Sequence, residues 1–361
     1  MKTRCFPEQE LREAIAFALL PRVGGVAFRE GVERHGSASA AFRVTDAAGK
    51  SEALTHAADV IARARTKSIT LLVQGEPAYP HVLLDLADPP PFLYALGDGA
   101  LLRGRRVGIV GTRHASHSGE RIAQQMATAL VHAGAVVVSG MAFGIDAAAH
   151  RGALDAGGGT IAVLGGGVDL PYPPSHAMLH ERIAASGLVL AEAPIGSRPV
   201  KGAFPKRNRI IAALSEVLVV IEAGERSGAL ITSRIALDLG RTVAAVPGPI
   251  DSPRNIGSNR LLSDGAAFIG RVEDVLSLAE LESTAPKAVT PAVPAKGDDD
   301  PSEIAILRAV RSGTSELEDL ARSSGLPPRE FAGALSSLEL TGRLLVTDAG
   351  SVALTSRAIG V

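Results

Sequence analysis

Six short apolar runs, rich in valine and bounded by glycine, recur through the central part of the chain with helical stretches between them. They are VGIVG (107–111), AVVVSG (135–140), TIAVLG (160–165), LVLAE (188–192), VLVVIE (217–222) and TVAAVPG (242–248). Runs of this kind are typical of parallel strands that are buried on both faces. The strand–helix–strand repeats predict a doubly wound, Rossmann-like α/β fold, in which helices cover both faces of a mostly parallel sheet. Ligands of such folds bind beyond the carboxyl ends of the strands, so the loops there are the candidate functional segments.

The length and one biased segment predict how the chain is divided. Its 361 residues exceed the roughly 100–200 of a typical domain. Residues 284–300 are rich in proline and alanine and end in three aspartates, which is typical of a solvated linker. We therefore predict a helical domain over 1–70, an α/β domain over 71–283 and a small module over 301–361.

Cysteine use and polarity predict a cytoplasmic protein with no membrane segment. Cys5 is the only cysteine, so no intrachain disulfide and no cysteine-based zinc site are expected. No apolar run approaches the roughly 18 residues of a membrane helix, and the polar N-terminus lacks a signal-peptide core. Because the net charge is only −1, any binding of nucleic acid must depend on a local basic patch.

The N-terminal segment contains a helical pattern followed by a short turn. Leu11 and Ile15 recur at helical spacing, and Pro21 with Gly24-Gly25 resembles the turn of a helix-hairpin-helix motif. Amides of such a turn can hold a DNA phosphate. The alternative, which we favour, is a small helical domain that only packs against the rest of the chain.

The loop after the first central strand offers an anion site. Gly111, Thr112 and Arg113 lead into a predicted helix with Ser116 and Ser118 as candidate caps. Free amides at a helix N-terminus bind anions, and the guanidinium of Arg113 is expected beside them. The spacing matches neither GxGxxG nor GxxxxGK[ST], so neither a dinucleotide site nor a P-loop is predicted. We expect Arg113 to contact phosphate; the alternative is an ordinary surface arginine.

Two residue pairs have the spacing of metal ligands but lack the rest of a metal site. Asp146 and His150 lie four residues apart with no third ligand, so a buried Asp–His hydrogen bond or a helix cap by Asp146 is favoured. His176 and His180 have the spacing of HExxH, but Ala177 stands in place of the catalytic glutamate. A solvated helix is favoured there, and no metal ion is predicted.

The most informative segment runs from Ala193 to Ser215. It contains no acidic residue and five basic ones: Arg198, Lys201, Lys206, Arg207 and Arg209. Such a cluster in a near-neutral chain predicts a polyanion partner. Phe204 lies within the cluster and can stack on an unpaired base, a contact that contributes about 1–3 kcal/mol. The alternative is a solvated basic loop with Phe204 in the core.

The loops offer phosphate contacts but no group that would break a bond. A nucleotide-hydrolysing α/β family of similar build carries a PGGxGTxxE turn, whose glutamate has no counterpart after Ser227-Gly228-Ala229. No nucleophile triad, carboxylate pair or metal cage emerges from the loops. No catalytic residue and no cofactor are therefore predicted. The alternative is a nucleotide-binding or nucleoside-monophosphate-hydrolysing Rossmann enzyme.

Seven motifs, in order, closely resemble those of the DNA-processing protein A (DprA/Smf) family. They are GIVGTR, SGMAFGIDAAAH, TIAVLGGGVDLPYP, FPKRNRIIAALS, SGALITSRIALDLGR, VPG and GSNRLLSDGA, and they span about residues 100–270. The resemblance implies an extended Rossmann fold with a helical, sterile-alpha-motif-like (SAM-like) domain before it and a winged-helix-like domain after it.

The resemblance also implies a role without turnover. Family members bind single-stranded DNA, form a homodimer through the Rossmann domain, and help to load the RecA recombinase during natural transformation. Carried over by motif, the implied DNA-binding residues are Arg113, Lys201, Phe204, Arg207, Asn208 and Arg209. The charge pattern adds Lys206, and the strand ends add the amides of Gly111, Thr112, Ser139 and Gly140. Pro174 stands where some members have a DNA-contacting lysine, so that contact is expected to be missing.

Residues 301–361 fit a winged helix, with 327–342 as the recognition helix and 344–354 as the wing. A helix that reads DNA needs several basic groups. Here only Arg329 stands against Glu330 and Glu339. We therefore expect this module to contact protein or to regulate, because a fold alone does not fix a function.

Overall fold

The computed structural model describes residues 7–46, 48–200, 202–281, 300–312, 314, 316–346 and 352–354. The chain divides into two compact units, Met1–Ala285 and Pro286–Val361. Each unit has apolar clusters of its own. The predicted linker over 284–300 lies outside the described residues except for Asp300.

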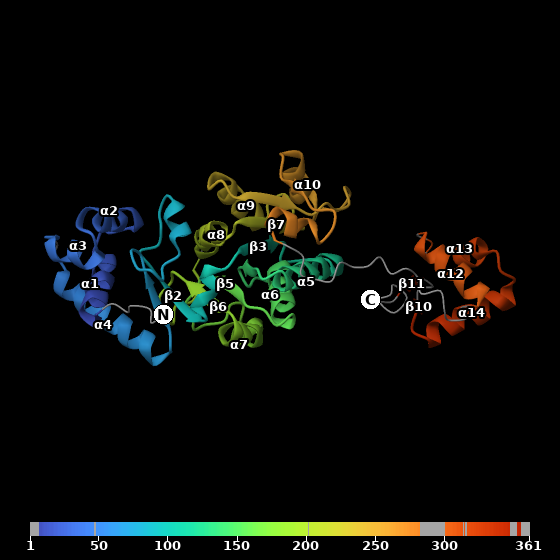
Figure 1. The fold of residues 1–361 in the computed structure, drawn as a ribbon, viewed down its shortest axis with the longest axis horizontal. Helices are drawn as coiled ribbons and strands as arrows, with labels where there is room; N and C mark the ends of the chain where they lie inside the picture. Colours follow the sequence, from blue (N-terminus) through green and yellow to red (C-terminus); the bar gives the residue numbers. More distant parts are fainter. Residues whose placement is uncertain are drawn as a thin grey trace. The chain divides into compact units, whose positions relative to one another are not determined.

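A nine-stranded sheet forms the centre of the first unit, with the strand order β1-β2-β6-β5-β4-β3-β7-β8-β9 (Figure 1). All six predicted strands are present, as β3 (Arg106–Gly111), β4 (Val136–Ser139), β5 (Thr160–Leu164), β6 (Leu188–Ala191), β7 (Val217–Ile221) and β8 (Thr242–Ala245). Each pairs in parallel with its neighbours among these six. The predicted parallel core is therefore confirmed.

The sequence pattern does not predict three further strands. β1 (Thr70–Val73) and β2 (Phe92–Gly97) add an antiparallel edge beside β6, and the short β9 (Ala267–Phe268) extends the other edge in parallel. Two short 3₁₀ helices follow these antiparallel strands in the chain: η1 (His81–Asp85) comes after β1, and η2 (Gly99–Arg103) comes after β2. The sheet is thus mixed, with a parallel centre.

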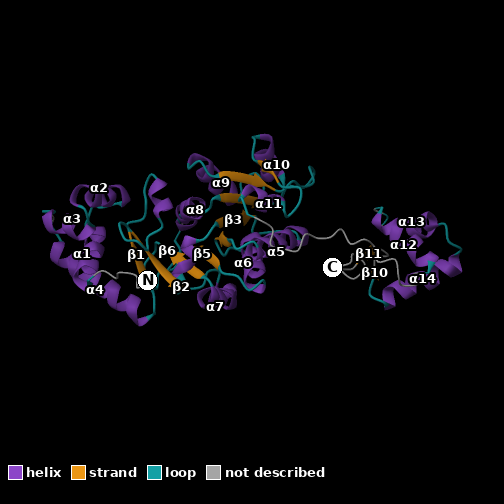
Figure 2. Ribbon diagram, viewed as in Figure 1, coloured by secondary structure: helices purple, strands orange, loops and turns teal. Residues whose placement is uncertain are grey.

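Helices cover both faces of the sheet, which confirms the doubly wound architecture (Figure 2). One face packs against α8 (Ala203–Leu214), α9 (Gly228–Asp238) and α10 (Ile256–Ser263). The other packs against α5 (His117–His132), α6 (Ile145–Asp155), α7 (Ala177–Ser186) and α11 (Asp274–Leu278). Alternate strand residues point to the two faces: Val110 and Leu218 to the first, Ile109 and Val219 to the second.

The strand order changes direction beside β3. The chain passes outward from β3 through β4 and β5 to β6, and then returns to place β7 on the opposite side of β3. The loops that follow β3 and β7 therefore diverge to opposite faces. This is the position at which open α/β sheets leave a crevice for a ligand.

Within the described residues, four helices precede the sheet and share a core with its edge. They are α1 (Glu8–Leu19), α2 (Gly25–His35), α3 (Ala38–Val44) and α4 (Lys50–Thr66), and Val73 of β1 belongs to their apolar cluster. The Gly25 amide donates to the Asp88 carboxylate at 3.1 Å, and a Cβ on Gly25 would lie 1.9 Å from the Pro89 carbonyl oxygen. The Gly25 amide of the hairpin-like turn is thus bonded within the protein. This favours the interpretation that the helical segment packs against the rest of the chain and does not bind DNA phosphate there. A domain boundary at residue 70 stays a prediction.

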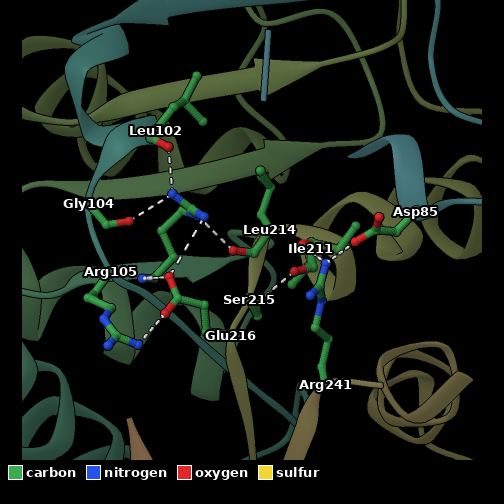
Figure 3. Close-up of polar contacts among 11 residues, drawn as sticks. Asp85, Leu102, Gly104, Arg105, Ile211, Leu214, Ser215, Glu216 and Arg241 are labelled. Carbon is green, nitrogen blue, oxygen red and sulfur yellow. Dashed lines mark hydrogen bonds and ion pairs between the residues drawn. The ribbon is translucent and has the colours of Figure 1, made fainter. Parts of the chain in front are cut away.

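A polar network surrounds the start of β3, at the end of the sheet opposite the carboxyl ends of the strands (Figure 3). The buried Arg106 guanidinium donates to the carbonyl oxygens of Gly104 at 2.7 Å and Leu214 at 2.8 Å, and also to that of Leu102. Its neighbour Arg105 is half exposed and forms an ion pair with Glu216 at 2.9 Å. Burial lowers the pKa of Arg106, opposed by the charge of Glu216. A buried cation therefore ties β3 to the segments on both sides of it.

The second unit is a winged helix, as predicted. It consists of α12 (Pro301–Arg311), α13 (Leu317–Ser324), α14 (Pro328–Leu340), and the antiparallel pair β10 (Leu344–Val346) and β11 (Val352–Leu354). Phe331 and Leu338 of α14 pack into its core. Across the described ranges of both units, no helix is long and apolar enough to cross a membrane.

Candidate nucleic-acid interface

A cavity of about 460 Å³ opens where the strand order changes direction. Four segments line it: the end of β3 and the loop after it, the loop from β4 into α6, α8, and the loop that leads from β7 into α9 together with the start of α9. Of the predicted site residues, Gly111, Thr112, Arg113, Phe204, Arg207 and Asn208 lie in its lining. The structure thus brings together residues from two segments that are about 90 positions apart in the chain. Lys201, which the sequence also predicts here, lies outside the described residues.

Arg113 and Phe204, which both line this cavity, form a stack with Tyr172. The Arg113 Cζ lies 5.2 Å from the centroid of the Phe204 ring, a cation–π distance. The Tyr172 ring lies 5.3 Å from the Phe204 ring, centroid to centroid, with 38° between their planes. Arg113 is exposed, and Phe204 is half-buried. The stack therefore offers a cation and an aromatic surface side by side, and Phe204 is not confined to the core.

Arg207, Ser139 and Gly140 lie deeper than Arg113 and Phe204, and their contact with DNA stays a prediction. Arg207 is only 7% exposed, and its Nη1 donates to the Val163 carbonyl oxygen. A Cβ on Gly140 would lie 2.0 Å from that Nη1, so only glycine leaves room for the guanidinium. Ser139 is buried and donates its hydroxyl to the Ile109 carbonyl oxygen at 2.6 Å. We call Arg207, Ser139 and Gly140 the inner wall. They are buried, and the loops that follow the strands cover them.

The charge of the inner wall is balanced by Asp146. Burial raises the pKa of the Asp146 carboxyl, while the positive charge of Arg207 opposes that shift. Burial likewise lowers the pKa of Arg207 to about 10, and Asp146 again acts in the opposite direction. The Asp146 carboxylate also accepts from the Ala142 amide at 3.3 Å. Asp146 and Arg207 are therefore buried groups of opposite charge, and both lie deeper in the protein than the exposed Arg113.

A second cavity, of about 530 Å³, lies on the other side of the first turn of α8 and is lined by Arg198, Lys206 and Arg207. Glu192, at the end of β6, also lines it and pairs with Lys206 at 3.2 Å and with Arg209 at 2.7 Å. Arg209 is mostly buried by this pair and lines neither cavity. Residues 193–215 contain no acidic residue, and Glu192 lies just before that segment. Lys206 keeps an exposed side chain, whereas Arg209 is a structural cation.

Comparison with known proteins decides the family. A profile described as "DNA recombination-mediator protein A" matches residues 70–280, and one described as "DprA winged helix domain" matches residues 290–350. The chain is 40% identical over 287 residues to the putative DNA processing protein DprA of Mycobacterium tuberculosis, covering 74% of this chain and 72% of the relative. The chain belongs to the DNA recombination-mediator protein A family.

Solved structures and a second relative agree with this assignment. DNA processing protein A of Streptococcus pneumoniae superposes with a TM-score of 0.65 at 32% identity, covering 77% of this chain and 99% of that one. The Helicobacter pylori protein, whose single-stranded DNA binding mode has been described, superposes with a TM-score of 0.55 at 31% identity, covering 59% and 97%. The DNA processing protein DprA of Bacillus subtilis is 39% identical over 217 residues, covering 60% of this chain and 73% of that relative.

The loop between β7 and α9 contributes residues to the first cavity that sequence reasoning missed. Arg226 is exposed and lines the first cavity, as do Ser227 and Gly228 at the start of α9. Ser227 is the N-cap of α9 and accepts from the Ala229 amide at 3.3 Å. A helix start favours an anion. The sequence does contain a pattern that could identify Arg226, because this basic residue stands just before a capping serine in the loop after a predicted strand.

The start of α5 is not the anion site that the sequence predicts. Ser116 caps this helix as expected, but its amide donates to the Glu222 carboxylate at 2.9 Å, and its hydroxyl contacts the same carboxylate. A Cβ on Gly119 would lie 2.7 Å from Glu222 Cδ. The protein therefore places its own carboxylate at the start of α5, whereas the start of α9 lines the cavity.

The two candidate ligand pairs have structural roles. The predicted Asp146–His150 bond is wrong, because His150 Nδ1 lies 2.8 Å from the Thr160 hydroxyl instead. The prediction of a solvated helix at His176 and His180 is also wrong: both rings are buried beside carbonyl oxygens, His176 at the end of η3 (Pro174–His176). Among the described residues, no three histidine, cysteine or acidic side chains come together as a metal site.

His150 makes stability depend on pH. Burial lowers its pKa from 6.5 to about 3, so the folded protein holds it neutral. The unfolded chain binds a proton there as the pH falls below about 6.5, and this stabilises the unfolded state. We expect the free energy of unfolding to drop by up to about 1.4 kcal/mol per pH unit between pH 6 and pH 4. Urea titrations of wild type and His150→Gln at pH 7, 6, 5 and 4 measure this. Equal pH slopes for both proteins would contradict it.

Proposed function

We propose that this protein binds single-stranded DNA at the first cavity and acts as a recombination mediator without turnover. The observation that carries the proposal is the Arg113–Phe204 stack beside a cavity that is also lined by exposed Arg226. Arg113, Arg226 and the start of α9 suit backbone phosphates, which carry no sequence information. The Phe204 ring suits an unpaired base of any identity. Because bases in a duplex are already stacked, this combination favours a single strand.

The single-stranded DNA binding described for the Helicobacter pylori relative supports the proposal. Lys206 and Arg198 line the second cavity, on the far side of Phe204, and extend the basic surface for the same strand. Lys201 and Asn208 complete the proposed set. We assign Arg207, Ser139, Gly140 and Arg209 to positioning rather than contact, because each is buried or held in an internal bond.

The finer parts of the role belong to the same proposal. Family membership supports loading of RecA onto the bound strand during natural transformation, in the cytoplasm. One cavity holds few nucleotides, so a homodimer formed through the Rossmann domain would raise affinity by effective concentration. Sedimentation velocity is expected to give twice the monomer mass, and the protein is expected to speed RecA filament assembly on coated single strands. A monomer with full affinity for long oligonucleotides would contradict the dimer.

Binding of labelled oligo-dT, followed by fluorescence anisotropy across a salt series, tests the proposal. We expect the single strand to bind more tightly than a matched duplex. The logarithm of the association constant should fall linearly with the logarithm of salt concentration, with about 0.7 of slope for each phosphate contact. Preference for the duplex would contradict the proposal. If neither DNA binds and nucleoside monophosphates release free base, the alternative of a Rossmann hydrolase is correct.

A further inference from the structure

Exposed aromatic side chains concentrate beside the first cavity. The chain has nine phenylalanines, three tyrosines and no tryptophan, so aromatic rings are scarce. Within the described residues, three of them are well exposed: Phe143 at 48%, Tyr172 at 42% and Phe268 at 63%. Phe268 lies on the edge strand β9. The other two lie in loops at the carboxyl edge of the sheet, Phe143 in the loop after β4 and Tyr172 in the loop after β5.

Tyr172 adjoins the cavity through Phe204. Its ring lies 5.3 Å from the Phe204 ring, which in turn lies under the Arg113 guanidinium. The two aromatic planes make an angle of 38° with each other. A base on Phe204 and the next base on Tyr172 would therefore be neighbours along one strand.

Phe143 adjoins the cavity through Arg113. It precedes Gly144, where a Cβ would lie 3.0 Å from the Arg113 backbone carbonyl carbon. The Phe143 ring also packs edge-on against the His176 ring, at 4.8 Å between centroids and 70° between planes. His176 in turn belongs to the Tyr172 loop, because its amide donates to the Pro173 carbonyl oxygen at 2.9 Å. His176 thus links Phe143 to the loop that carries Tyr172.

We propose that Tyr172 and Phe143 extend the stacking surface of Phe204, so that successive unpaired bases of one DNA strand lie along it. This inference rests on the proposed function of the cavity and adds to it that bases, as well as phosphates, are bound at several positions. The occupant is identified by its chemistry. Half-exposed rings beside an exposed arginine suit flat, unpaired bases that are joined by an anionic backbone. A protein partner would instead require a continuous apolar patch.

Single tryptophan substitutions test the inference directly, because the wild-type chain has none. We expect oligo-dT to quench the fluorescence of Tyr172→Trp and Phe143→Trp, since a stacked base quenches an indole. An abasic oligonucleotide of the same length should leave both signals unchanged. Met178→Trp is the matched control, because Met178 is 72% exposed on the neighbouring α7 and no ring contact involves it among the described residues. Its signal should not change with either DNA.

Affinity gives an independent readout. Tyr172→Leu and Phe143→Leu should each weaken oligo-dT binding roughly tenfold, with an unchanged salt slope and unchanged affinity for the abasic strand. Tyr172→Phe should bind as wild type, because it keeps the ring. If wild type binds oligo-dT but neither tryptophan is quenched, or if abasic DNA quenches equally, the inference is overturned and the proposed function stands. If wild type does not bind oligo-dT, the proposed function itself fails.

Discussion

Replacing Arg113 and Phe204 together with alanine is expected to weaken binding of oligo-dT by roughly 30- to 1000-fold. A charge-assisted contact to phosphate and a stacked base each contribute on the order of 1–3 kcal/mol, and together about 2–4 kcal/mol. The two effects should not add fully, because the Arg113 Cζ lies 5.2 Å from the Phe204 ring and each side chain orients the other. Anisotropy with the single variants and the double variant measures both the loss and the coupling.

Arg182→Ala is the matched control for the change in charge. Arg182 is half exposed on α7 and pairs with Asp155 at 2.6 Å, and it lines neither cavity at the edge of the sheet. It should leave affinity for oligo-dT within twofold of wild type. If the double variant also bound within twofold of wild type, DNA binding would have to be assigned to other surfaces of the protein.

Arg106→Met is expected to lower the free energy of unfolding by about 3 kcal/mol. The substitution keeps most of the side-chain volume but leaves the carbonyl oxygens of Leu102, Gly104 and Leu214 without their donor (Figure 3). Each polar group left unpaired in a buried position costs about 1–3 kcal/mol. Arg106→Lys should recover only part of the loss, since one ammonium cannot reach all three carbonyls in the geometry of the planar guanidinium. Urea unfolding followed by circular dichroism measures these losses.

The neighbouring arginine is the control for this experiment. Arg105 is half exposed, and its ion pairs with Glu216 and Glu280 lie at the surface. Such pairs contribute at most about 1 kcal/mol, so Arg105→Met should unfold close to wild type. Equal losses for Arg105→Met and Arg106→Met would show that the buried network does not stabilise the sheet in the way described.

The parallel centre of the fold could be predicted because its signal is local. Each valine-rich run between glycines marks a strand that is buried on both faces. Five of the six runs match an observed strand to within one residue at either end, and the last run extends three residues beyond β8. The antiparallel edge has no such signal. Tyr94 of β2 pairs with Ala191 of β6, which is almost a hundred residues away, and nothing in either segment specifies that partner.

The sequence could predict which loops form the candidate site, but not which of their side chains are exposed and which are buried. Charge and residue type predict Arg113 and Phe204, and the structure places them together. The same reasoning could not separate Lys206 from Arg209, because burial depends on Glu192 and on the Asp88 carbonyl oxygen, which accepts from Arg209 at 2.6 Å. Depth beneath a surface is a property of tertiary packing, and residue type alone does not encode it.

The most direct test of the central claim is ultraviolet cross-linking of oligo-dT to the wild-type protein, followed by identification of the modified residues by mass spectrometry. A thymine stacked on an aromatic ring is well placed to cross-link. We expect the modified peptides to carry Phe204, with Tyr172 as the next site. Cross-links confined to the helices before residue 67 or to the winged helix, with none in the peptide that carries Phe204, would contradict the account.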